Sequence, residues 1–534
     1  MLHSHEPMAR AWVTPGMDPV TDLLFIAPRA RAIVSSAGRC WSRALAMGMI
    51  FSLPALVLGL NVSVGPGYAQ AQERSRAAGE QLAQIVALVD TGHFQDAQAH
   101  IDQALAKPGL GATQRHALEF ERERMRRIRL DFTLDEAQAK AKVRTQIPDL
   151  RDEEFAAWDQ QGLFEYLVID GQKRYFQRAP SNLFRLSAQA LARRGADAKP
   201  LSEGPMERLN PHHAQVRDAA MATGYGAPRR VRISQSLTVN ADAVPAGKTV
   251  RAWLPYPRDL PHQQEDIRLL ASTPARSRIA PRSAPQRTIY LEQSAKAGQA
   301  TKFEVSYELT VFGQYRKIDP DKVVTAPVDD ETRPFLGERA PHIVYTEALR
   351  KFSREVVGDE TNPYRIAKKL YAAVDRIPWA GAREYSTISN ISDYALHAGH
   401  ADCGQQTLLL MALLRLNGIP SRWQSGWVYG DNGYTNMHDW AWMYLAPYGW
   451  MPIDVTTGRL DSPDSQLADF YFGGLDAYRV AYNDDYGRDF VPAKRFDRSE
   501  TVDLQRGEVE WEGGNLYFDQ WDYDYSARVL TAKE

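Results

Sequence analysis

The sequence is poor in cysteine, with only two in 534 residues, Cys40 and Cys403. So few thiols exclude a disulfide-stapled scaffold. Cys40 lies just ahead of an apolar segment that has the features of a secretory signal, so Cys403 is the only thiol expected in the mature chain. Because a lone thiol is a liability in an oxidising compartment, its presence favours a catalytic role for Cys403.

An excess of basic residues is also absent. The chain has 64 Lys and Arg against 66 Asp and Glu, which gives a formal net charge of −2 at pH 7. Proteins that bind nucleic acid present a basic surface, and this balance offers none. The composition therefore argues against a nucleic-acid partner.

Long apolar runs are equally scarce. The one such run, residues 44–60, follows Arg39 and Arg43 and precedes the small residues Ala69 and Ala71. This order is typical of a secretory signal cleaved after Ala71, which predicts a periplasmic or secreted protein with no stable membrane span. The alternative is an uncleaved anchor, because about 17 apolar residues lie at the short limit for spanning a bilayer.

Changes in hydrophobic periodicity divide the chain into several parts. Helical spacing dominates its first third, and period-two alternation marks strands from Arg229 to Phe312. The predicted parts are a signal peptide with an upstream extension (1–71), a helical hairpin (72–131), a mixed α/β part with a winged-helix arrangement as one option (132–228), a β-sandwich (229–318), a linker (319–341) and a catalytic core with a C-terminal extension (342–534).

The stretch 398–457 carries the candidate chemistry. Cys403 precedes an apolar segment, 407–416, that ends at Gly418 and Pro420, and these two residues close and stop a helix. Cys403 therefore lies in the first helical turn. There, unpaired backbone N–H groups and the positive end of the helix dipole are expected to lower the pKa of its thiol and to favour a nucleophilic thiolate.

Two strand-like runs follow this helix. Residues 438–445 alternate with period two, and residues 450–455 read as the return strand of a hairpin. An even loop would place Asp454 on the face away from His438, whereas a three- or five-residue loop or a bulge places it opposite Trp440, one diagonal step from His438. We predict an odd loop or a bulge, which makes Asp454 the partner of His438.

These residues resemble the transglutaminase-like core, a papain-like cysteine fold. The resemblance covers about residues 336–489, and its most specific parts are Asp402-Cys403-Gly404, the run 415–422, His438-Asp-Trp and the run 450–454. It implies a helix bearing the cysteine, packed on an antiparallel sheet that bears the histidine and the aspartate. The chain is thus expected to be an α+β multidomain protein, with the β-sandwich and the N-terminal helical region ahead of this core.

The resemblance also implies roles for single residues. Cys403 would be the nucleophile, His438 the base and then the acid, and Asp454 the group that orients His438. An oxyanion would be held by the backbone N–H of Cys403 and by a side-chain donor upstream. Trp379, His397 and His400 are the candidates for that donor, and the spacing does not choose between them.

Other residues near the motifs have competing interpretations. Trp427, Asp439 and Trp440 are candidates for the substrate cleft, although the tryptophans also fit a packed core and Asp439 also fits a solvated or capping acid. His397 and His400 form a metal-like spacing with Cys403, but no fourth ligand follows at a recognisable distance. No metal and no cofactor is therefore expected.

The expected function is that of an exported cysteine hydrolase. It would attack an amide of a peptide, protein or cell-envelope substrate and form a thioester at Cys403, since acyl transfer needs a thiolate, a proton carrier and an orienting acceptor. Two alternatives stay open. One is a protein-glutamine gamma-glutamyltransferase that joins a glutamine to an amine, and the other is a peptide- or glycan-binding module without catalysis.

Overall fold

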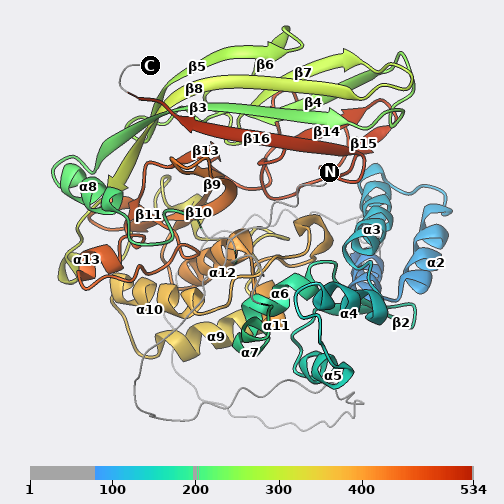
Figure 1. Cartoon of the computed structure of the whole chain (residues 1–534), viewed down its shortest axis with the longest axis horizontal. Helices are drawn as coiled ribbons and strands as arrows, with labels where there is room; N and C mark the ends of the chain where they lie inside the picture. The colour runs from blue at the N-terminus through green and yellow to red at the C-terminus, as the bar shows by residue number, and fades with distance from the viewer. Residues whose placement is uncertain (1–78, 196–200, 202–203, 532–534) are drawn as a thin grey trace, which may run out of the picture. The chain divides into compact units, whose positions relative to one another are not determined.

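The computed structural model describes residues 79–195, 201 and 204–531 and shows a mixed α/β chain with several antiparallel sheets (Figure 1). The predicted signal segment, its cleavage site and Cys40 lie outside the described residues. Within the described residues, no helix is long and apolar enough to cross a membrane.

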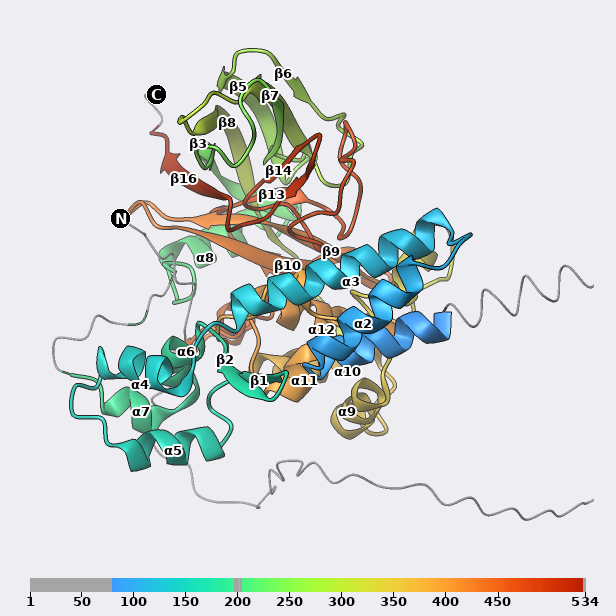
Figure 2. The same ribbon diagram turned by 90° about the vertical axis from the view of Figure 1, so that its right-hand side faces the viewer.

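Helices dominate residues 79–195 and share one apolar cluster. The helices α2 (Phe94–Leu105) and α3 (Ala112–Asp131) lie side by side (Figure 2). The turn Asp170-Gly171, with φ of 48° and 81°, joins β1 (Tyr166–Ile169) to β2 (Gln172–Tyr175), because Asp-Gly suits a two-residue turn with positive φ. Residues 79–90 are helical as well, and the remaining helices here are α4 (Glu136–Arg144), α5 (Asp152–Gln160), α6 (Ala179–Leu186) and α7 (Ala188–Ala192).

Two antiparallel sheets share a second apolar cluster. The first has the order β12-β8-β3-β16 with β5 also paired to β8, and the second has the order β15-β14-β4-β7-β6. Helix α8 (Pro211–Ala220) packs on β3 and β8. The strand bounds are β3 (Tyr225–Val239), β4 (Thr249–Pro255), β5 (Gln264–Thr273), β6 (Ser277–Ile279), β7 (Thr288–Ser294), β8 (Thr301–Tyr315), β12 (Gly474–Leu475), β14 (Glu508–Trp511), β15 (Gly514–Leu516) and β16 (Trp521–Val529).

The C-terminal tail is part of these two sheets. β16 pairs with β3 along its whole length, from Trp521 opposite Val239 to Val529 opposite Val231, and β14 pairs with β4. Figure 1 shows the red strand β16 beside the green strand β3. Segments almost three hundred residues apart in the chain thus complete one sheet, which ties the tail to the strand region.

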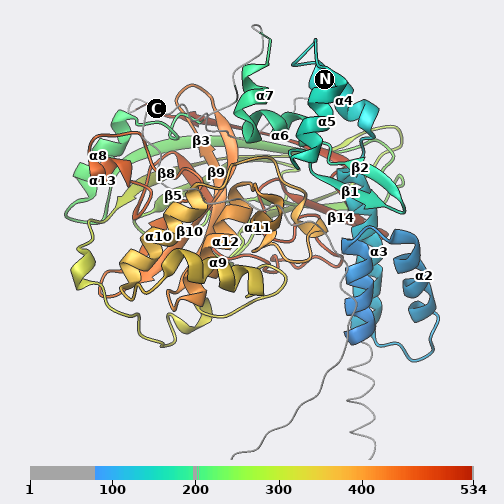
Figure 3. The ribbon, with the colours of Figure 1, turned by 90° about the horizontal axis from the view of Figure 1, so that it is seen from below.

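The region between these segments has helices on one side of a four-stranded antiparallel sheet with the order β11-β10-β9-β13. Helices α9, α10 and α12 contact one another and lie together in Figure 3. The elements are η1 (Pro320–Lys322), η2 (Arg333–Phe335), α9 (Glu347–Val357), α10 (Pro363–Asp375), η3 (Tyr385–Thr387), α11 (Tyr394–Ala398), α12 (Cys403–Leu416), β9 (Ser421–Tyr429), β10 (Thr435–Leu445), β11 (Gly449–Ile453), α13 (Ser465–Ala468) and β13 (Arg479–Asn483).

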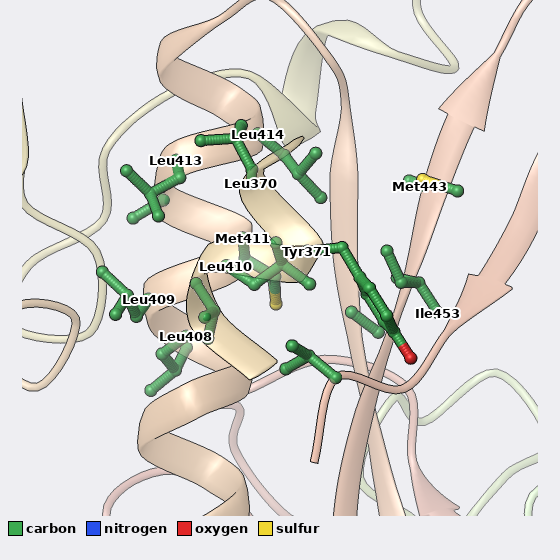
Figure 4. Packing of buried hydrophobic residues seen from close by; sticks show 14 of the residues in the cluster. Leu370, Tyr371, Leu408, Leu409, Leu410, Met411, Leu413, Leu414, Met443 and Ile453 are labelled. Atoms are coloured by element: carbon green, nitrogen blue, oxygen red, sulfur yellow. The ribbon is translucent and has the colours of Figure 1, made fainter. Parts of the chain in front are cut away.

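Helix α12 is the most deeply buried of these helices, with all of residues 404–415 buried. Its leucines pack against Leu370 and Tyr371 of α10 and against Met443 of β10 (Figure 4). The helix ends where the sequence predicts, because Gly418 takes a φ of 73° just after its last turn. This packing fixes the first turn of α12, and with it Cys403, against the sheet.

The hairpin of β10 and β11 has the predicted odd loop. Ala441 pairs with Ile453 and Leu445 pairs with Gly449, which leaves a connection of residues 446–448. In this register the residue after Ile453 falls opposite Trp440, on the face of β10 that carries His438. The prediction that Asp454 shares a face with His438 is therefore confirmed.

Candidate active site

Cys403 is the first residue of α12, and its side chain lines a cavity of about 110 Å³. Asp402 caps the helix, since its carboxylate accepts a hydrogen bond from the backbone N–H of Gln405 at 3.0 Å. Gln405 returns the bond through its side chain, which completes a capping box. A rigid helix start therefore presents the sulfur to the cavity.

The cavity is walled by segments that are distant in the sequence. Most of its side chains are charged or aromatic, and they come from the residue before α6, from the segment before α11, from the start of α12, from β10 and from residues 500–525. Its lining residues include Arg178, Trp379, Arg383, Glu384, Tyr385, Asp402, Cys403, Asn436, Met437, Asp439, Glu500, Asp503, Gln505, Arg506, Tyr523 and Tyr525.

The sulfur of Cys403 meets a carboxyl group. Its thiol donates a hydrogen bond to Oδ2 of Asp439 at 3.2 Å, while Nε2 of Gln505 donates to the other oxygen, Oδ1, at 2.8 Å. Asp439 is buried, with 2% of its surface exposed. The interpretation of Asp439 as a solvated or capping acid is therefore wrong, because the strand turns this side chain inward against the start of α12.

Acidic side chains crowd the cavity and change one another's protonation. Burial raises the pKa of Asp439 far above its usual range, and the nearby carboxylates of Asp503 and Asp402 raise it further. Burial likewise raises the pKa of Asp402 to about 6 and that of Glu500 to about 8. These acids therefore keep their protons to a higher pH than they would in water.

The same surroundings act on the nucleophile. Burial raises the pKa of the Cys403 thiol well above its usual value, and the neighbouring acidic side chains of Asp439 and Asp402 add to this effect. The expectation that the helix dipole lowers this pKa is therefore wrong for the resting arrangement. At an exposed helix start the dipole stabilises a negative charge by no more than about 1 kcal/mol. The loss of water around the thiol, beside two acids, opposes the thiolate more strongly.

His438 and Asp454 form a buried pair on the other face of β10. Nε2 of His438 lies 2.7 Å from Oδ2 of Asp454, and both side chains have no exposed surface. The hydroxyl of Thr457 donates to the same oxygen at 2.7 Å, and the backbone N–H of Thr457 donates to Oδ1 at 3.0 Å. Asp454 is thus held as an acceptor that faces His438 through one ring nitrogen.

The second ring nitrogen of His438 is left free. In the described part of the chain, Nδ1 of His438 is buried and has no hydrogen-bond partner, and no hydrogen bond joins it to Cys403. His438 and Asp439 point to opposite faces because they are neighbours on a strand. The last residue of β11 pairs with Ala441, so β11 does not cover the edge of β10 beside His438.

A buried cation supports the histidine–aspartate pair. Nη1 of Arg479 lies 3.0 Å from Oδ2 of Asp454, and Nη2 lies 2.5 Å from Oδ2 of Asp476. The hydroxyl of Tyr471 also bonds Asp476, at 2.8 Å, and Nε2 of His213 lies 3.0 Å from that hydroxyl. A continuous polar chain therefore runs from His438 to helix α8.

Arg479 and His438 decide the charge of Asp454. Burial acts to raise the pKa of this carboxyl, but the adjacent His438 imidazole, the Arg479 guanidinium and their hydrogen bonds outweigh it and hold the pKa far below the usual range. Asp454 is therefore a carboxylate at neutral pH, which suits an acceptor that orients an imidazole.

The three oxyanion candidates have different positions. Trp379 lines the cavity beside Cys403, and its indole N–H is buried without a hydrogen-bond partner in the described residues. His397 is exposed and lies 3.4 Å from Asp393. His400 is buried against Tyr394 and bonds the backbone oxygen of Ala398, away from the cavity lining.

The cleft candidates also divide. Asp439 lines the cavity, whereas Trp427 and Trp440 do not. Trp427 stacks on Tyr525 with ring centroids 4.3 Å apart, and the indole N–H of Trp440 donates to Gln424 at 2.7 Å. Both tryptophans are buried packing residues in this arrangement.

No group of three or more His, Cys, Asp or Glu side chains in the described residues is arranged to hold a metal ion.

The sequence of residues 350–455 matches the transglutaminase-like superfamily. The chain therefore carries a transglutaminase-like domain. This domain contains α12, β10 and the whole of β11, and it ends one residue after Asp454. No protein with a curated description matches the sequence.

Solved structures give distant similarities to the chain around this transglutaminase-like domain. A candidate cysteine protease from Cytophaga hutchinsonii has 15% identity and a TM-score of 0.38, with 58% of this chain and 93% of that chain covered. The periplasmic domain of TgpA from Pseudomonas aeruginosa, bound to ethylmercury, has 13% identity and a TM-score of 0.22, with 48% and 97% covered. A candidate protease from Parabacteroides distasonis has 9% identity and a TM-score of 0.18, with 48% and 68% covered.

Several residues at the transglutaminase-like domain's cavity were not found from the sequence. Tyr385 donates to Oδ1 of Asp402 at 2.8 Å, and Arg506 bonds Glu384 through two nitrogens at 2.9 and 2.6 Å. Asp503 shares a hydrogen bond with Asp439. No local pattern marks them, because each reaches the cavity through tertiary packing.

Proposed function

We propose that the chain is an exported cysteine hydrolase that cleaves an amide of a peptide, protein or cell-envelope substrate. Cys403 is the nucleophile, His438 the proton carrier and Asp454 the group that holds the imidazole. Export rests on the signal-like segment at residues 44–60.

The proposed reaction has two steps. The Cys403 thiol gives its proton to Nδ1 of His438, and the sulfur bonds to the amide carbon while the C–N bond breaks. The leaving amine takes the proton from His438, which leaves a thioester at Cys403. Water then gives a proton to His438, attacks the thioester carbon and releases the acid as the sulfur leaves and regains its proton.

The buried His438–Asp454 pair is the observation that carries this proposal. A carboxylate at 2.7 Å from Nε2 favours the tautomer with its proton on Nε2 and leaves Nδ1 as an acceptor. Nδ1 has no competing partner among the described residues, and β11 ends before it could cover that edge of β10. A proton acceptor is thus available on β10, the strand whose Asp439 contacts the Cys403 thiol.

Transfer to an amine is the runner-up within catalysis. Both outcomes share the thioester, and they differ only in what resolves it. A labelled primary amine separates them, since an incorporated label indicates transfer and a released acid indicates hydrolysis. Water is the more abundant acceptor, so hydrolysis is the first expectation.

A binding module without catalysis is favoured by one observation. The Cys403 thiol is bonded to Asp439 and not to His438, and its pKa is raised. If this arrangement never changes, the cavity binds a ligand and the cysteine is structural.

Acylation by p-nitrophenyl acetate tests catalysis without a known substrate. We expect a burst of p-nitrophenol and an acetyl group on Cys403 by peptide mass spectrometry, both absent in Cys403→Ser. Removing the base in His438→Ala should slow acylation by about 10² to 10⁴. Trp450→Phe, in which a half-buried indole loses its 2.9 Å bond to Glu331, is the control and should acylate normally. Equal acylation of the wild type and of His438→Ala would contradict the proposal and favour the binding module.

A further inference from the structure

The residue that touches the sulfur is not a member of the proposed triad. Asp439 accepts the Cys403 thiol hydrogen bond at 3.2 Å, follows His438 directly in β10, and faces the start of α12. Gly404 makes the approach possible, because a Cβ atom there would lie 2.1 Å from Oη of Tyr385 and 2.8 Å from Oδ2 of Asp439. The close contact between thiol and carboxyl is therefore part of how α12 and β10 fit together.

Asp439 is itself held from several sides. Nε2 of Gln505 donates to its Oδ1 at 2.8 Å, and Asp503 shares a hydrogen bond with it. Asp503 in turn bonds Ser425, the residue that pairs with Asp439 across β9 and β10. Contacts on both oxygens fix the carboxyl in place, so the thiol that it binds is fixed as well.

We propose that Asp439 is a positioning residue that holds the Cys403 thiol in a resting orientation, away from Nδ1 of His438. The thiol must leave Asp439 before it can give its proton to His438. This inference rests on the proposed role of Cys403 as nucleophile, and it adds that the reactive state forms only when the Asp439 contact opens.

The charge of the neighbouring acids sets how tightly the thiol is held. The groups that face Asp439 are Cys403 and Asp402 at the start of α12, Asp503 and Gln505 from the tail, and Tyr385 of η3. Two carboxyl groups that share a hydrogen bond, here Asp439 and Asp503, retain one proton between them far above the usual range. Loss of that proton at higher pH places more negative charge beside the sulfur and opposes thiolate formation.

Two isosteric substitutions separate the contact from the charge. Asp439→Asn removes the carboxylate that touches the sulfur and leaves Asp503 as a more distant charge. Asp503→Asn also removes one carboxyl group from the cavity but leaves Asp439 against the sulfur, now without the acid that raised its pKa. The proposal predicts opposite results from these two changes, although both remove one carboxyl group.

The readout is alkylation of Cys403 by iodoacetamide against pH, measured on the full chain as the modified Cys403 peptide. Asp439→Asn should shift the midpoint of the profile to lower pH by at least about one unit, which is about tenfold faster alkylation below the midpoint. Asp503→Asn should be no faster than the wild type. An asparagine at position 439 could still accept a hydrogen bond from the thiol, so Asp439→Ala, which cannot, is measured as well. Near-UV circular dichroism checks that each variant folds.

The inference fails if Asp439→Asn and Asp439→Ala, both folded, react no faster than the wild type. It also fails if Asp503→Asn accelerates alkylation as much as Asp439→Asn, because the effect would then be one of total charge. Alkylation does not need His438 as a base. Faster alkylation in Asp439→Asn, with acylation unaffected by His438→Ala, would support the inference and contradict the proposed triad.

Discussion

The two faces of strand β10 hold two aspartates in opposite protonation states. On one face, Asp454 pairs with His438 and Arg479, which keep its pKa far below the usual range. On the other face, Asp439 meets Cys403 and two further acids, and burial together with those acids raises its pKa far above the usual range. Both side chains are buried, so burial alone does not decide the outcome.

The difference lies in the partners. A buried carboxyl stays charged only where a cation or several donors replace the water it has lost, and it takes up a proton where other acids surround it. Asp454 has a guanidinium, an imidazole and two donors from Thr457. Asp439 has one amide donor and a thiol. An ionised acceptor, Asp454, thus lies on one face of β10, and an acid with a raised pKa, Asp439, lies on the other.

The largest effect is expected from removing Arg479, the cation that keeps Asp454 ionised. Arg479→Met keeps the apolar stem but leaves Asp454 and Asp476 buried without their shared positive charge, and we expect a loss of about 3 to 5 kcal/mol in the free energy of unfolding. Urea denaturation measures it. Arg459→Met is the control, because its 3.0 Å pair with Asp469 is 54% exposed on the arginine side and should contribute less than about 1 kcal/mol. Equal losses in the two variants would show that Arg479 does not stabilise the pair.

A second test concerns Trp379, which lines the cavity and whose indole N–H is a buried donor without a hydrogen-bond partner in the described residues. Trp379→Phe keeps the ring that stacks under Arg185 and removes only the donor. If the indole holds the oxyanion, acylation should slow by about 10² to 10³, or roughly 2.7 to 4 kcal/mol, with alkylation of the thiol unchanged. An equal slowing of both reactions would instead indicate a distorted cavity, and unchanged acylation would leave the donor role to another group.

Local patterns in the sequence were enough to predict the placement of the candidate residues. The stop at Gly418 and Pro420 gave the end of α12, and counting with period two gave the odd loop and the shared face of His438 and Asp454. Each of these inferences concerns residues within one helix or one hairpin. Backbone geometry alone connects them, so a single sequence contains the information.

The surroundings of the same residues could not be predicted in this way. Arg479 reaches Asp454 from another strand, and Gln505 reaches Asp439 across 66 residues of chain. The wrong expectation for the Cys403 thiol has the same origin, because the helix dipole is a local effect whereas burial and the acids come from tertiary packing. The pairing of β16 with β3 likewise depends on contacts that no local period encodes.

The smallest expected effect concerns the titration of Glu500, one of the acids that line the cavity. Burial raises the pKa of Glu500 to about 8 although Arg506 opposes this, so the folded chain keeps a proton that the unfolded chain releases near pH 4.5. The folded state then binds more protons between these values, and stability should fall as pH rises from about 5 to about 8. Glu500→Gln cannot titrate, and its urea midpoint should fall less steeply over this range.

The slope should be reduced and not abolished, because Asp131 and Asp402, whose pKa values burial raises to about 7 and about 6, still titrate in the same window with the same sign. Glu347→Gln is the control. Arg354 lowers the pKa of that exposed carboxyl, so its titration lies below the window and the slope should equal that of the wild type. If Glu500→Gln also leaves the slope unchanged, Glu500 is already ionised in the folded chain over this range and is not one of the protonated acids of the cavity.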